Sequence, residues 1–264
     1  MSADILNNVA FSTEGHALRD VTKRIECNGG TLVDLAASDG YNYSATGALV
    51  ASGLWQGVAI EGDPIKFAKL AFLYRQFPLK LVRNWITPEN FCATLEGNQV
   101  PLNFDLLNLD IDGYDLDVLR SMLAGGYRPK VISMEINEKI PPGIYFEVLY
   151  HPDYQWNNDH FYGCSLESAV DVLNKADYTL VELHEQNAIF LEGNLAQTFD
   201  FSSLSVSEAY KSGYLGLADR EKRFWYNSDV DYWLELAPHE AIGEIRQFFE
   251  RHQGKYRLEI IQDS

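Results

Sequence analysis

Oxygen-bearing side chains follow two neighbouring apolar runs of the chain. Asp110 and Asp112 come directly after the run that ends at Leu109. Glu135 and Asn137 close the next such run, and residues two apart share one face of a strand. Carboxylate and amide oxygens are the ligands that hard divalent cations such as Mg²⁺ prefer. We therefore predict a metal site here; in the alternative interpretation, Asp110 holds the amino group of a cofactor and Asp112 caps a helix.

The turn after the first apolar run combines small and acidic residues. It reads Asp34-Leu35-Ala36-Ala37-Ser38-Asp39-Gly40, and small residues let a ligand approach the backbone. A helical pattern follows, and then a second apolar run ends at Glu61, whose carboxylate can accept hydrogen bonds from a ribose diol. In parallel sheets, ligands bind beyond the carboxyl ends of the strands. We therefore predict a nucleoside-cofactor site with the following members: Asp34, Ala36, Ser38, Asp39, Gly40, Glu61, Gly62 and Asp110.

Three histidines are candidates for a general base: His151, His160 and His184. His160 is the best placed of them, because it lies in an irregular, aromatic stretch beside Asp159 and Tyr162. An imidazole with a pKa near neutrality can take a proton from a hydroxyl group. We predict His160 as the catalytic base, against the structural or solvent-exposed role that a lone histidine more often has.

Apolar runs and helical patterns alternate along most of the chain. Strands are predicted at 32–35, 56–60, 79–82, 104–109 and 130–134, with helices between them. Two further apolar runs within 179–191 are close enough for a hairpin that closes the sheet. We therefore predict an α/β fold with a doubly wound, Rossmann-like, mostly parallel sheet of about seven strands and helices on both faces.

The sequence divides into two predicted parts. Residues 1–192 form the cofactor-binding domain, and residues 193–264 form a helical and irregular C-terminal extension that packs on the core or makes a dimer contact. An amphipathic helix is expected in this extension near 238–252. Within the first part, residues 138–164 look irregular, with Pro141-Pro142-Gly143 followed by aromatic and polar residues. A long loop of this kind often forms a lid or substrate wall beside an active site.

Composition restricts the partners and the compartment. The chain has 264 residues and a formal net charge of -17, which opposes non-specific binding to nucleic acid and to anionic membranes. No apolar stretch is long enough to span a bilayer, and Met1-Ser2-Ala3-Asp4 lacks the features of a signal peptide. The three cysteines are widely spaced and form no CxxC, which indicates reduced thiols. We expect a cytoplasmic protein with a small-molecule acceptor and no nucleic-acid or membrane partner; a homodimer stays open.

Four motifs in order resemble the class I methyltransferases that use S-adenosylmethionine, and among them the FkbM-type family. Residues 34–41 match D-[IL]-G-A-x-x-G-Y, and residues 105–113 match D-L-L-x-[IL]-D-[IVL]-[DE]-G. Residues 135–137 match E-x-N, and residues 162–166 resemble Y-F-G-A-S-L. The resemblance covers residues 30–192. One departure is Ala36, where the motif has glycine; an alanine is tolerated there if its φ is negative.

The resemblance implies an S-adenosylmethionine-dependent methyltransferase that methylates a hydroxyl group of a small molecule, such as a sugar or a natural product. The acceptor oxygen would attack the methyl carbon in line, and the enzyme would mainly contribute orientation. The acidic strand ends are similar to the metal arrangement of catechol-type O-methyltransferases, so Mg²⁺ or another divalent cation is a second expected cofactor. Three alternatives stay open: a catalytically inactive binding protein of this fold, an enzyme that uses S-adenosylmethionine for another reaction, and an NAD enzyme, which the lack of G-x-G-x-x-G disfavours.

Overall fold

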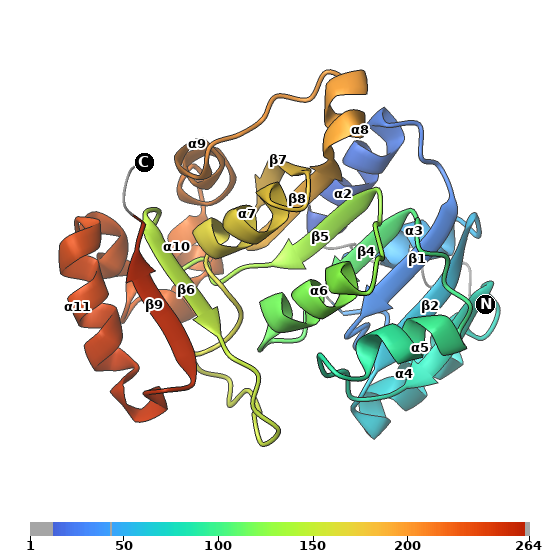
Figure 1. The fold of residues 1–264 in the computed structure, drawn as a ribbon, viewed down its shortest axis with the longest axis horizontal. Coiled ribbons are helices and arrows are strands. Elements are labelled where there is room, and N and C mark those ends of the chain that lie inside the picture. The colour runs from blue at the N-terminus through green and yellow to red at the C-terminus, as the bar shows by residue number, and fades with distance from the viewer. Residues whose placement is uncertain (1–12, 43, 262–264) are drawn as a thin grey trace.

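A seven-stranded sheet crosses the computed structural model, which describes residues 13–42 and 44–261 (Figure 1). Its strands are β1 (Gly30–Leu35), β2 (Trp55–Glu61), β3 (Leu79–Arg83), β4 (Leu106–Leu109), β5 (Val131–Glu135), β7 (Tyr178–His184) and β8 (Asn187–Glu192). They lie in the order β3-β2-β1-β4-β5-β8-β7. β1 to β5 pair in parallel, and β8 is antiparallel to both β5 and β7. The predicted Rossmann-like, mostly parallel sheet is therefore confirmed.

Helices cover both faces of this sheet (Figure 1). One face carries α2 (Thr13–Arg24), α3 (Gly47–Ala51), α4 (Pro64–Tyr74) and α8 (Gly193–Thr198). The other carries α5 (Phe91–Gly97), α6 (Asp115–Ala124), α7 (Leu166–Asn174) and α9 (Val206–Tyr210). Successive strand side chains point to opposite faces, so Leu32 packs in one core while Val33 packs in the other.

Two helices begin at caps that are visible in the sequence. The Asp63 carboxylate accepts from the backbone N–H groups of Ile65 and Lys66, both at 2.8 Å, and Pro64 takes the first helical position of α4. The Ser165 hydroxyl accepts from the N–H of Ser168 at the start of α7. Both caps set where a helix leaves the sheet.

A second, two-stranded sheet joins distant parts of the chain. β6 (Ile144–Val148) pairs antiparallel with β9 (Tyr256–Ile260), and α11 (Pro238–Phe248) packs against β9. The expectation that 138–164 is irregular is therefore wrong for its middle. β6 is buried at every position, so it shows no alternation of polar and apolar residues that would indicate a half-buried strand.

The rest of the extension consists of short helices. They are a π-helical turn (Lys211–Leu215), α10 (Arg220–Arg223) and 3-10 turns at Trp225–Asn227, Asp231–Glu235 and Glu250–His252. No helix in the described part of the chain has the length and apolarity needed to cross a membrane. The expectation of no signal peptide concerns residues 1–4, which lie outside the described residues.

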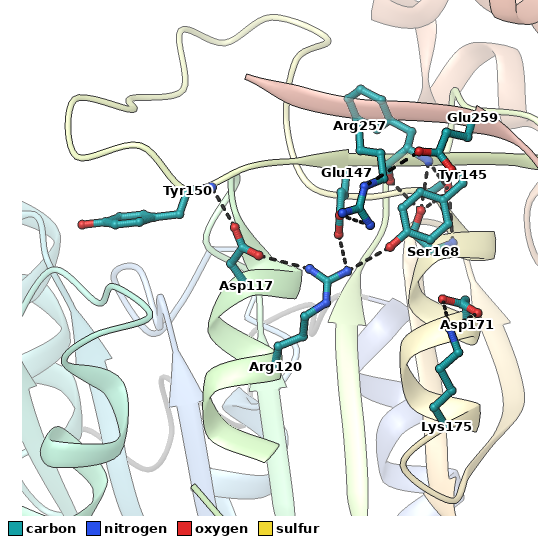
Figure 2. Close-up of polar contacts among 12 residues, drawn as sticks. Asp117, Arg120, Tyr145, Glu147, Tyr150, Ser168, Asp171, Lys175, Arg257 and Glu259 are labelled. Carbon is teal, nitrogen blue, oxygen red and sulfur yellow. Dashed lines mark hydrogen bonds and ion pairs between the residues drawn. The ribbon is translucent and has the colours of Figure 1, made fainter. Parts of the chain in front are cut away.

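Ion pairs join the second sheet to α6, a helix that covers one face of the main sheet (Figure 2). Glu147 on β6 is 1% exposed and lies between two guanidinium groups: Arg120 of α6 and Arg257 of β9, the latter at 3.2 Å. Arg120 also donates to the hydroxyl of Tyr145 at 2.9 Å and to Asp117 at 3.1 Å. β9 of the extension is thus held to β6 by an ion pair as well as by strand pairing, and the same carboxylate joins β6 to α6.

Candidate active site

The predicted cofactor and metal residues gather at one edge of the main sheet. β2, β1, β4 and β5 are parallel neighbours, so the loops that follow them meet at their carboxyl ends. The pairing sets Asp34 of β1 opposite Asn108 of β4, and Leu109 opposite Met134 of β5. The loops after these four strands therefore form the candidate active site.

The turn after β1 is built from left-handed residues. Ala36, Ser38 and Gly40 have φ angles of +63°, +51° and +72°. Glycine is required at position 40, because an added Cβ would lie 2.8 Å from carbons of both Leu70 and Tyr74. Ala36 does not have the negative φ that would make alanine free of strain there. A left-handed alanine costs about 1–2 kcal/mol, so the backbone conformation of the motif is kept without its glycine.

Glu61 closes this turn from the end of β2. Its side chain is 5% exposed, and its two oxygens accept from the N–H groups of Ser38 at 2.9 Å and Asp63 at 2.7 Å. A carboxylate offers about four lone-pair sites, so each oxygen keeps the capacity to accept another hydrogen bond. The arrangement fixes the carboxylate at the place where the sequence predicts the ribose contact.

Asp34 lies beneath the turn and is 2% exposed. It accepts from the Thr46 hydroxyl at 2.6 Å and from the Asn108 side-chain amide at 3.0 Å. Burial raises the pKa of this carboxyl, and the two hydrogen bonds oppose that rise. Asp34 thereby joins β1 to β4 and to the start of α3, which holds the turn in place.

Asp39 and Gly62 lie at the borders of the turn. The Asp39 carboxylate accepts from the backbone N–H groups of Tyr41 at 3.0 Å and Asn42 at 2.9 Å, so it shapes the turn. Gly62 lies under the ring of Trp85, which a Cβ at position 62 would approach to 2.3 Å. The Trp85 ring therefore covers the backbone just after Glu61, although Trp85 itself is 69% exposed.

Three of the four predicted metal ligands come together. Asp110, Asp112 and Glu135 each offer a carboxylate oxygen, and these oxygens lie within 4.8 Å of one another. Burial and then Asp115 raise the pKa of Asp112 to about 6, and burial, Asp110 and Asp112 raise that of Glu135 well above its usual range. Converging carboxylates repel one another, and a hard cation bound by oxygen ligands relieves that repulsion. The donor set fits Mg²⁺ or a similar ion.

Asn137 is the fourth predicted ligand and is fully buried. Its side-chain amide donates to the carbonyl oxygens of His160 and Tyr162, both at 2.9 Å. Its own Oδ1 is buried and has no hydrogen-bond partner among the described residues. Since buried polar atoms are nearly always bonded, this oxygen is an acceptor kept available two residues after Glu135.

His160, the predicted base, lies where the aromatic loop meets the extension. Its Nε2 is 3.0 Å from Oδ1 of Asp229, and its ring centre is 5.7 Å from that of Phe248. Its backbone carbonyl is held by Asn137, so the residue is tied to the end of β5. The role of His160 as a base stays a prediction.

A buried polar network behind the acidic cluster was not predicted from the sequence. Glu138 and Lys139 are 0% and 2% exposed, and Lys139 Nζ lies 3.1 Å from Glu138 and 2.7 Å from the Tyr162 hydroxyl. The Tyr162 hydroxyl donates to Glu138 at 2.7 Å, and the side-chain amide of Asn227, from the extension, also donates to Glu138, at 2.6 Å. The adjacent opposite charges at 138 and 139 were a local signal, but nothing local indicates Asn227.

Asp115 is a second residue that the sequence did not single out for this site. It is 2% exposed and accepts from the N–H groups of Ile111 at 2.9 Å and Gly113 at 3.0 Å. These bonds fix the loop that carries Asp110 and Asp112, and Asp112 has a left-handed φ of +54° in it. An acidic residue in the first turn of α6 was the available signal.

Comparisons with known proteins find similarity at the level of structure. No family model matches the sequence, and no curated protein matches it. A putative caffeoyl-CoA O-methyltransferase from Staphylococcus aureus is 12% identical with a TM-score of 0.47, over 73% of this chain and 93% of that one. An S-adenosylmethionine-dependent methyltransferase from Clostridium acetobutylicum is 12% identical with a TM-score of 0.44, over 71% and 94%. The N-terminal domain of EvdMO1, in the presence of SAH and D-fucose, is 13% identical with a TM-score of 0.44, over 69% and 83%.

Proposed function

We propose that this chain is an S-adenosylmethionine-dependent methyltransferase that methylates a hydroxyl group of a small molecule with the help of a divalent cation. One observation carries the proposal. Glu61 is buried against the left-handed turn after β1, at the same sheet edge as the acidic cluster of Asp110, Asp112 and Glu135. A cofactor with a ribose diol and an acceptor bound through a cation would meet at this edge.

Each part of the site has a distinct task in the proposed reaction. S-adenosylmethionine supplies an electrophilic methyl group, and a divalent cation supplies a Lewis acid that lowers the pKa of a hydroxyl. Glu61 would accept hydrogen bonds from the ribose, while Asp110, Asp112, Glu135 and Asn137 would hold the cation. His160 takes the acceptor proton, and its contact with Asp229 orients the imidazole. The chain contributes orientation and proton removal.

Calorimetry with S-adenosylmethionine tests the cofactor half. Glu61→Ala should weaken binding by about 1–3 kcal/mol, because hydrogen bonds to a charged group are lost. Glu96→Ala serves as the matched control, since Glu96 is exposed on α5 and should leave the affinity unchanged. Equal affinity in the wild type and Glu61→Ala would remove Glu61 from the cofactor site.

Turnover with a panel of hydroxylated small molecules tests the catalytic half. Methyl transfer to oxygen is expected, with His160→Ala slowed by about 10²–10⁴-fold between pH 6 and 9 while cofactor affinity stays unchanged. Cofactor binding without transfer to any acceptor would instead support a binding protein. A product other than a methyl ether would support a different use of S-adenosylmethionine.

A further inference from the structure

The outer edge of β9 presents backbone groups that pair with no other strand of the described chain. β9 has β6 as its one strand neighbour there (Figure 1). At the two ends of this ladder, Leu149 donates to the carbonyl of Lys255, and Ile261 donates to that of Gly143. Odd-numbered residues of β9 therefore bond β6, since bonded and non-bonded pairs alternate along an antiparallel ladder. The N–H and C=O groups that point outward belong to the even-numbered residues Tyr256, Leu258 and Ile260.

β9 lacks the features that usually protect an edge strand. Proline and β-bulges are common means of blocking such an edge. β9 contains no proline, and its five pairs with β6 run from Ile260 to Tyr256 without a register shift. A hollow of about 660 Å³ lies between α11 and the part of β9 that holds Tyr256 and Leu258, and it leaves room beside the strand. A regular, unpaired edge of this kind is a template for a further strand.

The sequence of β9, Tyr-Arg-Leu-Glu-Ile, is complementary to itself in one antiparallel register. Outward-facing residues bond only with each other, so a two-fold axis near the middle of the strand passes at Arg257, Leu258 or Glu259. An axis at Arg257 or Glu259 sets two like charges directly opposite each other, which is destabilising. An axis at Leu258 sets Arg257 opposite the partner's Glu259, twice. It also sets Tyr256 opposite the partner's Ile260 on the other face, so apolar side chains meet there.

We infer that β9 pairs with β9 of a second copy of this chain, antiparallel about Leu258, to form a four-stranded sheet of order β6-β9-β9-β6. Glu259 is 68% exposed and lies 4.0 Å from Arg257 of its own strand, so a single copy compensates its charge poorly. Arg257 keeps its ion pair with Glu147 and adds the partner's Glu259, because a guanidinium carries five donors. The inference does not depend on the methyl-transfer reaction.

The charge of this surface is balanced, although the whole chain carries -17. The segment 238–261, which includes α11 and β9, contains four Lys or Arg residues and four Asp or Glu residues. The contact therefore brings two locally neutral surfaces together, and exposed charges farther apart than about 8 Å are largely screened at physiological salt. A neutral edge favours neither an acidic nor a basic peptide, so the register about Leu258 is what selects a second copy.

Sedimentation velocity tests the inference with the full chain between about 1 and 100 μM, the range over which a micromolar complex dissociates. The mass should rise with concentration from 29.9 kDa toward twice that value. Leu258→Pro removes an outward N–H and should weaken the dimer by at least about tenfold. Leu258→Ala is the matched control, because it loses the same side chain but keeps the N–H, and it should weaken the dimer less. Circular dichroism verifies that both variants are folded.

Glu259→Arg tests the register. This change sets two cations opposite each other at both symmetric positions and should weaken the dimer by about fivefold. Glu96→Arg is the matched control, since it changes the net charge equally at an exposed position of α5 and should leave the dimer unchanged. Equal weakening in both variants would mean that net charge governs the association, and the register about Leu258 would be wrong.

Amide hydrogen exchange distinguishes this edge from any other dimer contact. The N–H groups of Tyr256, Leu258 and Ile260 should exchange slowly only where the dimer forms, whereas those of Arg257 and Glu259 should be slow at every concentration, because β6 holds them. A chain that stays monomeric would overturn the inference. A dimer whose even-numbered β9 amides still exchange fast, or one that Leu258→Pro and Leu258→Ala weaken equally, would also overturn it, because strand pairing would then not be the contact.

Discussion

Two buried carboxylates in this molecule have opposite surroundings. Glu147 on β6 is 1% exposed and lies between the guanidinium groups of Arg120 and Arg257 (Figure 2). Glu135 at the end of β5 is 6% exposed, accepts from the neutral amide of Gln186, and has other carboxylates as its closest charged neighbours. The first group is neutralised by the chain itself. The pKa of Glu135 is raised, because burial and the neighbouring carboxylates both disfavour its ionised form.

The difference separates a structural contact from a candidate ligand site. A buried ion pair whose partners come from the fold holds β6 between α6 and β9 and needs no outside charge. Converging carboxylates without such compensation lower stability unless something positive binds there. Glu138 agrees with the first pattern, because Lys139 and two hydrogen bonds hold its pKa below the usual range despite burial.

The largest expected effect comes from breaking the compensated pair. Glu147→Ala should lower the free energy of unfolding by about 3 kcal/mol, the lower end of the range for a broken buried pair, because Arg120 keeps Asp117 and is one-third exposed. Urea denaturation measures this loss. Glu259→Ala is the control: Glu259 is 68% exposed at 4.0 Å from Arg257, and a change within about 0.5 kcal/mol is expected. Similar losses of unfolding free energy in both variants would show that the buried pair of Glu147 and Arg120 contributes no more than an exposed one.

The matching change at the acidic cluster should behave in the opposite way. Glu135→Gln is expected to leave the metal-free protein at least as stable as the wild type at pH 8. The folded-state pKa of Glu135 is raised, so the native state binds more protons than the unfolded one above about pH 4.3, and stability falls as pH rises toward the folded pKa. Glutamine removes this dependence. A loss like that of Glu147→Ala would mean that Glu135 is a compensated structural carboxylate after all.

Removal of divalent cations sharpens the same comparison. Protein treated with EDTA and dialysed should lose methyl transfer by at least about 100-fold, and Mg²⁺ or Mn²⁺ should restore it. Asp112→Ala and Glu135→Ala should be inactive yet still bind cofactor. Protons compete for the cluster, so cation affinity should weaken as pH falls below about 6, where Asp112 is protonated. Full activity after chelation, with no gain from either ion, would leave these carboxylates to cofactor binding and structure.

The smallest expected effect concerns backbone strain at the cofactor turn. Ala36→Gly should stabilise the protein by about 1 kcal/mol or less, because glycine adopts the left-handed φ of +63° without a Cβ penalty but loses more entropy on folding. Thermal denaturation measures the change. Ala37→Gly is the control, since Ala37 is not among the positive-φ residues and should be destabilised instead. A loss of stability in Ala36→Gly would mean that the alanine methyl makes contacts worth more than the strain.

Local patterns predicted the main sheet and the acidic residues that lie at its edge. Strands β1 to β5 follow largely apolar runs, and their parallel arrangement follows from the helices between them. Because β4 and β5 are parallel neighbours, the residues that follow them lie at the same edge of the sheet. Carboxylate oxygens of Asp110, Asp112 and Glu135 lie within 4.8 Å of one another there. The left-handed φ of Ala36 was not predictable from the residue type, because alanine normally has a negative φ and only the folded turn shows the positive one.

The sequence by itself determined the alternation of strands and helices, the caps of α4 and α7, and the acidic residues at the strand ends, since these depend on neighbours within a few residues. Only the tertiary structure decided that β6 pairs with β9 and that Asn227 bonds Glu138. Ile144 pairs with Ile260 far along the chain, and no local periodicity specifies such a partner. Long-range pairing depends on which surfaces remain to be buried after the main sheet has formed, which is a property of the folded whole.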